Sequence, residues 1–405
     1  MPEGWRYIAQ RAAGRWAGTA EPILDWEVPL SLSSNPQREL SGPGALAGTI
    51  EPEYARMIGS DGQPILQDWG TKLYLEIEGV IRWGGLVTKT AFDGAKCTVN
   101  CEGFTAYPQG IPFEGYLISG ALITPKDPYA GKDKNHDGWV DGKKGKQRVP
   151  DPPKPYGGPR IDTYDAFRSI WSHIQSRPNG NLGLTIDSHD SGELLGAKDG
   201  SDPWELAWWN NPDCGQALDS LARDMPFDWV ESHSWSGGGN TISHRITLGK
   251  PRLGRKRTDL RFADGENILA IAKPEGMGDD FANEVVVLGT GEGKKMKRAQ
   301  VYRSDNRLRR VATVTDKTLS SDSALRKRGE QELAGRTAAL QIPAIQIVDH
   351  PNARLGSWSL GDDILVQVHV PWVGDVQVWH RIVADEISAD GLVVLTLKRS
   401  DSFHY

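Results

Sequence analysis

The sequence is poor in cysteine, and the few thiols it has form no recognisable set. Its 405 residues include three Cys, at positions 97, 101 and 214. An odd and sparse count excludes a disulfide framework. Cys97 and Cys101 lie four residues apart in a predicted strand, so both side chains are on one face, but no other Cys or His pair completes a zinc site. We therefore expect buried structural thiols.

Long apolar runs and a strong net charge are also missing. No stretch has the length needed to cross a bilayer, and the opening MPEGWRYIAQRAAGRW has no apolar core of a secretory signal. We therefore expect a soluble protein made in the cytoplasm. The 47 basic and 53 acidic residues give a net charge of -6, which argues against a broad basic surface that grips nucleic acid. A mildly acidic wall would instead let nucleic acid slide past.

Glycine, proline and tryptophan are abundant, with 46, 25 and 15 residues respectively. This composition and the alternating apolar pattern predict a β-rich α+β fold with many turns. Turn dipeptides at residues 78–79 and 93–94 predict two hairpins in the first part of the chain. The last part ends in three alternating runs, which predict strands at residues 363–370, 377–387 and 392–398.

Helical periodicity is confined to a few segments. One predicted helix begins near Asp162, and a second covers residues 213–225. The longest candidate covers about 320–339, with Ser321 or Asp322 as its cap. The pattern indicates four regions: a β domain at 1–120, a Pro/Gly-rich insertion at 121–160, a mixed region at 161–250 and a second β domain with the long helix at 251–405.

The insertion contains the sequence DKNHDGWVDG, which is typical of a calcium loop. Alternate oxygens converge around a tight turn at Gly138, and hard oxygen ligands at this spacing suit Ca²⁺. Position 12, normally a bidentate Glu, is Lys144. We expect a structural Ca²⁺ that orders the insertion, and the alternative is a solvated Asp/Gly turn. The predicted ligands are Asp133, Asn135, Asp137, Trp139 through its carbonyl, and Asp141.

Catalytic motifs are absent from the sequence. There is no nucleophile elbow, no zinc-protease motif and no phosphate-binding loop. Asp187, Asp190 and Glu193 with His189 would suit a carboxylate pair of a cell-wall hydrolase, but a polar loop is the simpler interpretation. We therefore expect no enzymatic activity. The Trp208-Trp209 pair and the calcium-type loop leave a Ca²⁺-dependent carbohydrate-binding module as a second alternative.

Basic residues gather near position 300. The simpler interpretation is a pair of solvated hairpin faces, and the sharper one is a docking surface for an acidic partner or a neighbouring copy. No aromatic residues are interleaved there as a base-stacking platform would require. The residues predicted for this interface are Lys294, Lys295, Lys297, Arg298, Arg307, Arg309 and Arg310.

The order of several segments resembles a known family. WEVPL at 26–30, ALDSLA at 217–222 and LGDDILVQV at 360–368 are the clearest of them. Together they resemble minor tail proteins of long-tailed phages (siphoviruses). The class is the baseplate-hub or tail-tip hub, similar to the hub of contractile-tailed phages and to the N-terminal part of tail-associated lysins. The 121–160 insertion is outside this resemblance.

The resemblance implies two tail-tube-like antiparallel β-barrel or sandwich domains around a smaller mixed α/β peripheral region. It also implies a homotrimer at the virion tail tip, made in the host cytoplasm, that continues the tail tube and lets genomic DNA pass through its lumen without specific binding. The implied partners are the distal tail protein ring, the tape measure protein, and tail fibres or other tip proteins. Because the sequence stops at Tyr405, soon after the last predicted strand, we expect no lytic domain.

Overall fold

The chain folds into two compact units in the computed structural model. The first comprises Met1–Ile111, Ile170–His189 and Asp213–Tyr405, and the second comprises Pro112–Ser169 and Asp190–Pro212. The predicted mixed region at 161–250 is therefore divided between the two units. The structure describes residues 4–12, 21–134, 136, 138–238, 241–271, 281–291, 293–316, 319, 321–337, 341–371 and 373–400.

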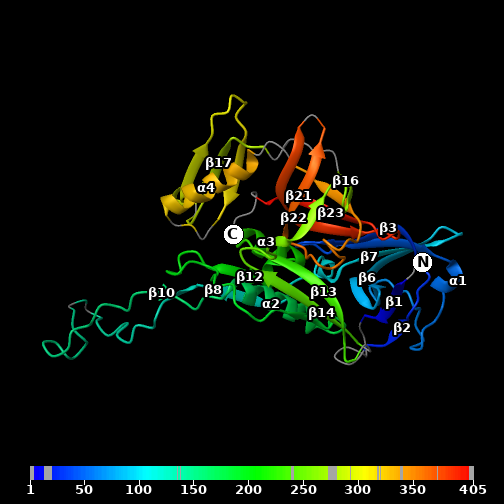
Figure 1. Ribbon diagram of the computed structural model, residues 1–405. Coiled ribbons are helices and arrows are strands. Elements are labelled where there is room, and N and C mark those ends of the chain that lie inside the picture. The colour runs from blue at the N-terminus through cyan, green and yellow to red at the C-terminus, as the bar shows by residue number, and fades with distance from the viewer. Residues whose placement is uncertain are drawn as a thin grey trace. The chain divides into compact units, whose positions relative to one another are not determined.

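Thirteen strands of the first unit form one hydrogen-bonded sheet (Figure 1). Its main path runs β16-β20-β23-β22-β3-β4-β7-β6-β5-β1-β2, and β21 pairs with both β22 and β15. The strands are β1 (Trp5–Arg11), β2 (Ile23–Asp25), β3 (Ser31–Glu39), β4 (Ala45–Ile50), β5 (Thr71–Ile77), β6 (Val80–Phe92), β7 (Cys97–Glu102), β15 (Lys256–Ala263), β16 (Ile268–Ile271), β20 (Ala344–Ile347), β21 (Asp363–Val370), β22 (Gly374–Ile387) and β23 (Val393–Arg399).

The two predicted β blocks share this sheet. Strand β22 pairs antiparallel with β3, and Asp385 lies opposite Arg38. The Arg38 guanidinium forms an ion pair with the Asp385 carboxylate, and the Asn35 amide donates to Glu386 at 2.7 Å. Because the path ends at β16 and β2, the described strands close no barrel, and the expectation of two separate barrel domains is not confirmed. A fold rich in antiparallel sheet is confirmed.

The predicted hairpins form as expected. Glu78 and Gly79 both have positive φ, 50° and 79°, in the two-residue turn between β5 and β6. Gly94, with φ 92°, serves the turn between β6 and β7. One hydrophobic cluster runs through both β blocks, and it includes Leu73 from β5 and Val366 from β21. Because both blocks bury apolar side chains in this shared core, their strands form one sheet and not two.

Two smaller sheets complete the first unit. Strands β11 (Leu184–Ile186), β14 (Thr241–Gly249) and β13 (Asp228–Ser236) form one of them, in that order. Strands β18 (Arg298–Tyr302), β17 (Glu284–Leu288) and β19 (Val311–Thr315) form the other. The helical segments of this unit are α1 (Pro52–Ala55), η1 (Phe104–Ala106), α3 (Cys214–Asp224), η4 (Gly293–Lys295) and α4 (Asp322–Arg336).

Helix α4 packs on β17 and β18 around a small separate core that includes Val285, Val287 and Leu333. The Ser321 hydroxyl accepts from the Ala324 amide at 3.2 Å, so the predicted cap is confirmed. Gly329 permits the close approach, because a Cβ there would lie 2.7 Å from Val301. The ends of the predicted helix, at 320 and 338–339, lie outside the described residues.

The second unit contains the predicted insertion. Strand β8 (Tyr116–Ser119) pairs with β12 (Trp204–Ala207), and β9 (Leu122–Ile123) pairs with β10 (Tyr156–Gly157) at the base of the insertion. The short helix η2 (Trp208–Asn210) follows β12, and α2 (Thr163–Gln175) contributes residues to both units. Between β9 and β10 the described residues form no helix or strand, and most are exposed (Figure 1).

Candidate functional site

The calcium-type loop closes on itself through two of its predicted ligands. The Asp133 carboxylate accepts from the Gly138 amide at 2.9 Å, and the Asp141 carboxylate accepts from the Lys134 amide at 3.2 Å. Gly138 has φ 77°, the left-handed conformation that position 6 of such a loop requires. Asn135 and Asp137 lie outside the described residues.

The remaining predicted ligand, Trp139, forms an isolated antiparallel bridge with Arg148. Its two hydrogen bonds join the Val140 amide to the Gln147 carbonyl and the Val149 amide to the Gly138 carbonyl, so neither uses the Trp139 carbonyl. The described part of the loop has the turn at Gly138 and two of the predicted carboxylates, Asp133 and Asp141, and Ca²⁺ binding stays a prediction. Among the described residues, no three His, Cys, Asp or Glu side chains gather as a metal site.

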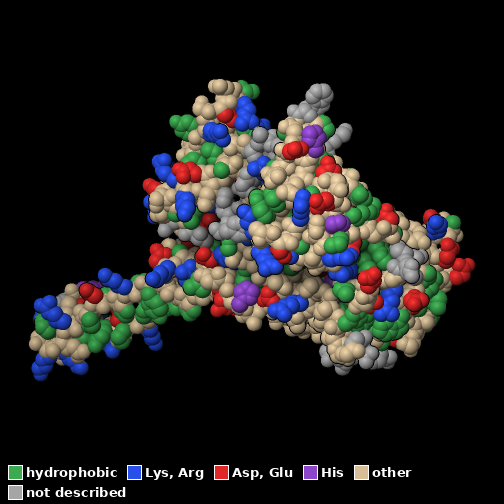
Figure 2. Space-filling view, viewed as in Figure 1, with side chains coloured by type: hydrophobic (Ala, Val, Ile, Leu, Met, Phe, Trp, Pro, Cys, Tyr) green, Lys and Arg blue, Asp and Glu red, His purple; other side chains and the backbone are tan. Residues whose placement is uncertain are grey.

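The basic residues near position 300 form two groups and not one surface. Lys294, Lys295 and Lys297 lie in the connection from β17 to β18, whereas Arg307, Arg309 and Arg310 lie in the connection from β18 to β19. These connections are at opposite ends of the small sheet, because Leu288 pairs with Arg298 and Glu284 pairs with Tyr302. Arg298 lies in β18 at the first of these ends. Basic side chains also stand out on the 121–160 insertion (Figure 2), where Lys132, Lys134, Lys143, Lys144, Lys146 and Arg148 are all exposed.

Two of the predicted interface residues, Arg309 and Arg307, have carboxylate partners. Arg309 donates from Nη2 to Glu284 at 2.6 Å and also pairs through Nε, and the Glu284 side chain is 8% exposed. The hydrogen bond from Arg309 lowers the pKa of Glu284. Arg307 pairs with Asp305 at 2.6 Å and lies 3.8 Å from the centre of the Phe281 ring. An assembly role for the basic residues stays a prediction, and it fits the exposed lysines best.

The carboxylates considered for hydrolysis have partners within their own units. In the first unit, Asp187 accepts from Arg245 Nε at 2.7 Å and from the Leu248 amide at 3.1 Å. In the second unit, Asp190 lies 3.6 Å from Arg168. Neither contact provides the reactive carboxylate pair that glycoside hydrolysis uses.

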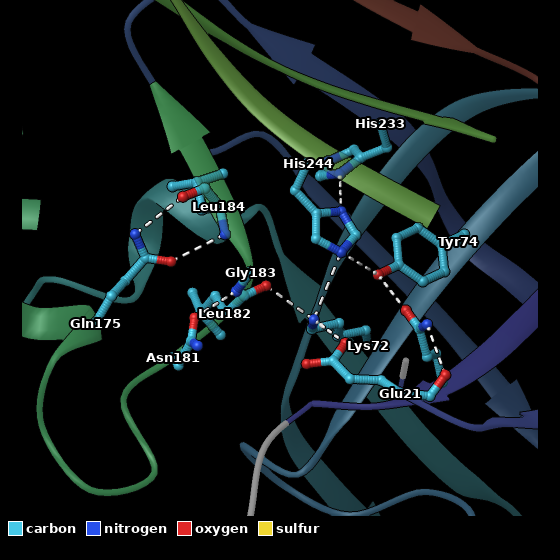
Figure 3. A network of polar contacts seen from close by, with 11 residues as sticks. Glu21, Lys72, Tyr74, Gln175, Asn181, Leu182, Gly183, Leu184, His233 and His244 are labelled. Atoms are coloured by element: carbon cyan, nitrogen blue, oxygen red, sulfur yellow. Dashed lines mark hydrogen bonds and ion pairs between the residues drawn. The ribbon is translucent and has the colours of Figure 1, made fainter. Parts of the chain in front are cut away.

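A buried polar network missed by the sequence analysis lies in the first unit (Figure 3). Lys72 of β5 is 0% exposed. Its ammonium pairs with the Glu21 carboxylate, donates to the Leu182 carbonyl at 2.9 Å and lies 3.5 Å from His244 Nε2. Burial raises the pKa of Glu21 and lowers that of Lys72, even though each charge favours the other.

The network continues from β5 to the neighbouring sheet. The Tyr74 hydroxyl lies 3.3 Å from His244 Nε2 and donates to Gln10 at 3.0 Å. His233 and His244 face each other across β13 and β14, with their Nδ1 atoms 3.1 Å apart. Burial, together with the charges of Lys72 and His233, lowers the pKa of His244 well below its usual value. This network fixes the small sheet to β5. Its only signal in the sequence is Lys72, which directly precedes the largely apolar run LYLEI at 73–77.

Aromatic side chains gather on the surface of the second unit. Trp208, Trp209 and Tyr116 are 58%, 54% and 48% exposed. The rings of Tyr116 and Trp209 are 5.1 Å apart, and those of Trp208 and Trp209 are 5.8 Å apart and nearly perpendicular. The three Cys are buried and form no disulfide, as predicted. No described helix has the length and apolar character of a membrane span.

Neither a protein-family model nor a curated protein matches this sequence. Among solved structures, the 43 kDa tail protein of prophage MuSo2 from Shewanella oneidensis is similar over 99% of this chain and 100% of its own, with 12% identity and a TM-score of 0.50. A tail protein from Neisseria meningitidis MC58 has 12% identity and a TM-score of 0.49, and covers 98% of this chain and 97% of its own. A p2 virion baseplate protein has 8% identity and a TM-score of 0.38, with coverages of 97% and 98%. The chain therefore has the fold of a phage tail protein over nearly its whole length, as the sequence resemblance implied.

Proposed function

We propose that this chain is a structural protein of a phage virion tail, and that it forms the homotrimeric hub of the tail tip. The observation that carries the proposal is the continuous sheet that joins both β blocks through β22 and β3, in a chain with a tail-protein fold from end to end. Of the described strands, β16 and β2 each have a single neighbour in the sheet. Such edges can pair with further copies, and repeated head-to-tail contacts close into a ring when the rotation allows it.

In this proposal the ring continues the tail tube and DNA passes through it. The net charge of -6 supports a lumen that does not retain phosphates. The distal tail ring and the tape measure protein would contact the ring from the tube side. Tail fibres or other tip proteins would attach to the outside, where a long basic insertion offers an electrostatic contact for an acidic partner.

The oligomeric state tests the proposal directly. Mass photometry of the purified chain should find particles of three times the 44.5 kDa chain mass, and negative-stain images should show rings. Mixing with the cognate distal tail protein should stabilise these rings. A chain that stays monomeric at micromolar concentration, alone and with that protein, would contradict the hub assignment.

We further propose that the 133–141 loop binds a structural Ca²⁺. Asp133, Asp141 and the Trp139 carbonyl would hold the ion, which would order the insertion in place of the present carboxylate-to-amide bonds. Calorimetry should show Ca²⁺ binding that Asp141→Asn weakens, while the exposed Asp151→Asn outside the loop serves as the matched control. Equal heats for all three proteins, or no heat for any of them, would remove the site.

A second candidate function is carbohydrate binding by the second unit. The exposed aromatic cluster of Tyr116, Trp208 and Trp209 favours it, because sugar rings stack on exposed aromatic faces. Binding of host cell-wall polysaccharide that is lost in Trp208→Ala, by a chain that remains monomeric, would favour this function over the hub. We propose no hydrolytic role, and incubation with peptidoglycan should release no soluble fragments.

A further inference from the structure

A small cavity of about 60 Å³ lies in the first unit among β3, β6 and β13. This volume is enough for a few water molecules or for one carboxylate or phosphate group. Charged residues at the end of β3 and near the start of β6 line it, together with the turn at Gly42 and Pro43. The lining residues that matter here are Arg38, Glu39, Arg82, Gly84, Glu231 and His233.

The first unusual group in this cavity is His233, whose side chain is 5% exposed. Its protonation follows from the buried network. We assign the protons from the hydrogen-bond network. With Lys72 donating to Glu21, to the Leu182 carbonyl and to His244 Nε2, the proton of His244 lies on Nδ1. In this assignment it points to His233 Nδ1, 3.1 Å away, so His233 carries a hydrogen on Nε2.

The His233 Nε2–H is therefore a buried donor, and no hydrogen-bond acceptor in the described chain meets it. The nearest carboxylate oxygen, of Glu231, is 3.9 Å away, beyond hydrogen-bond reach. The other oxygen of this carboxylate, Oε2, accepts from the Thr105 amide at 2.9 Å. Gly84 leaves room for the imidazole, since a Cβ there would lie 2.7 Å from the ring.

The second unusual group is Arg82, which lies at a β-bulge. Trp83 pairs with Leu75 and Ile81 pairs with Glu76, so Arg82 is the extra residue of β6. Bulges redirect side chains and are common beside functional sites. The Arg82 Nε–H is buried with no acceptor among the described residues, and the hydrogen bond from Nη2 to the Leu355 carbonyl is long, 3.4 Å. No ion pair with a described carboxylate balances its charge, whereas the nearby Arg38 is paired with Asp385.

We propose that this cavity is a binding site for one oxyanion group, a carboxylate or a phosphate, held between Arg82 and His233. A buried donor without an acceptor is costly, and the half-buried Arg82 has no described carboxylate within ion-pair distance. An oxyanion would accept from both donors and supply the missing charge. Glu231 and the exposed Glu39 add negative charge to the walls, so the site suits one compact anionic group and not a polyanion. The proposal is independent of the tail-tip function.

The direct test follows the His233 ring by NMR in protein labelled with ¹⁵N-histidine, which has nine His signals at most. Inorganic phosphate and acetate are the probes, and His233→Gln identifies the signal. We expect a saturable shift of this signal with one or both anions. Arg82→Gln should weaken the apparent affinity about tenfold or more, since a charge-assisted hydrogen bond is lost.

Two further variants keep the test decisive. Arg82→Lys retains the charge without the Nε–H, and it should give an intermediate affinity if Arg82→Gln does not fold. Arg223→Gln removes an exposed arginine of α3 and should bind like the wild type. If the signal moves only when chains associate and free anions reverse that change, the oxyanion is a carboxylate of a second copy. No saturable shift with anions or on association, or an equal shift in Arg82→Gln, would overturn the proposal.

Discussion

Lys72→Met is the most informative single change in the first unit. It removes a fully buried ammonium from between the Glu21 carboxylate and the Leu182 carbonyl, and it keeps the length of the side chain. The Glu21 side chain is 11% exposed and would lose its counter-charge. Removing one partner of a buried pair costs roughly 3–5 kcal/mol of unfolding free energy. We expect a loss of that size.

The pair itself should contribute much less than this loss. Burial raises the pKa of Glu21 and lowers that of Lys72, so the fold disfavours both charges despite their attraction. Adding Glu21→Gln to Lys72→Met should therefore restore the unfolding free energy to within about 1–2 kcal/mol of the wild type. A raised folded-state pKa at Glu21 contributes stability at low pH that is lost as the pH rises through that value. The destabilisation in Lys72→Met should accordingly be larger at pH 7 than at pH 5.

Urea unfolding of the four proteins of this double-mutant cycle measures these differences. A loss of 3–5 kcal/mol should also lower the melting temperature by about 4–7 °C for a unit of this size. The reasoning fails if Lys72→Met unfolds within about 1 kcal/mol of the wild type, because the pair would then be solvated. It also fails if the double variant is as unstable as the single one, since the loss would then come from packing and not from the unpaired carboxylate.

Three other perturbations test separate parts of the structure. Arg309→Glu places a second carboxylate against Glu284 and should lower the urea midpoint of the β17–β19 sheet, whereas Lys294→Glu at the opposite end of that sheet should leave it unchanged. Arg38→Gln removes the ion pair across β3 and β22, and hydrogen exchange should show about 1–2 kcal/mol less protection at that joint but not between β21 and β22. Burial of Asp162 raises the pKa of its carboxyl, but the hydrogen bonds that it accepts lower this pKa overall. Its stabilisation of the start of α2 should therefore be complete above pH 4 and be lost as the pH falls through the lowered pKa. Proteolysis of the second unit at low pH would reveal this loss.

Local patterns in the sequence predicted local structure well. The alternation in residues 363–370 became β21, and the dipeptide at 78–79 became a two-residue turn, because side-chain period and backbone sterics act over a few residues. The helix stripe of Phe167, Ile170, Trp171 and Ile174 is fully buried, as its spacing indicated.

The pairing of strands that are far apart in the chain could not be predicted from such local patterns. Nothing in the local sequence of Arg38 specifies Asp385 as its partner, nearly the whole chain away, and the joint of the two β blocks depends on that register. The same applies to His233 and Arg82, which are ordinary strand residues in the sequence and share one cavity only in the folded unit. The basic residues near position 300 are the converse case, because neighbours in sequence lie a strand length apart in the folded unit.

The joint between β3 and β22 also bears on assembly. In the ring proposed above, a stiff connection between the β blocks would be needed, because a hinge inside each chain would add to the variation in ring diameter. Here the connection consists of backbone pairing, a charged pair and a shared hydrophobic cluster, and these act together in one sheet. An isolated hydrogen-bonded contact would be too weak to hold the two blocks at one angle. The continuous core explains how such a chain could be a rigid building block, with adaptability left to the unpaired edges and the exposed insertion.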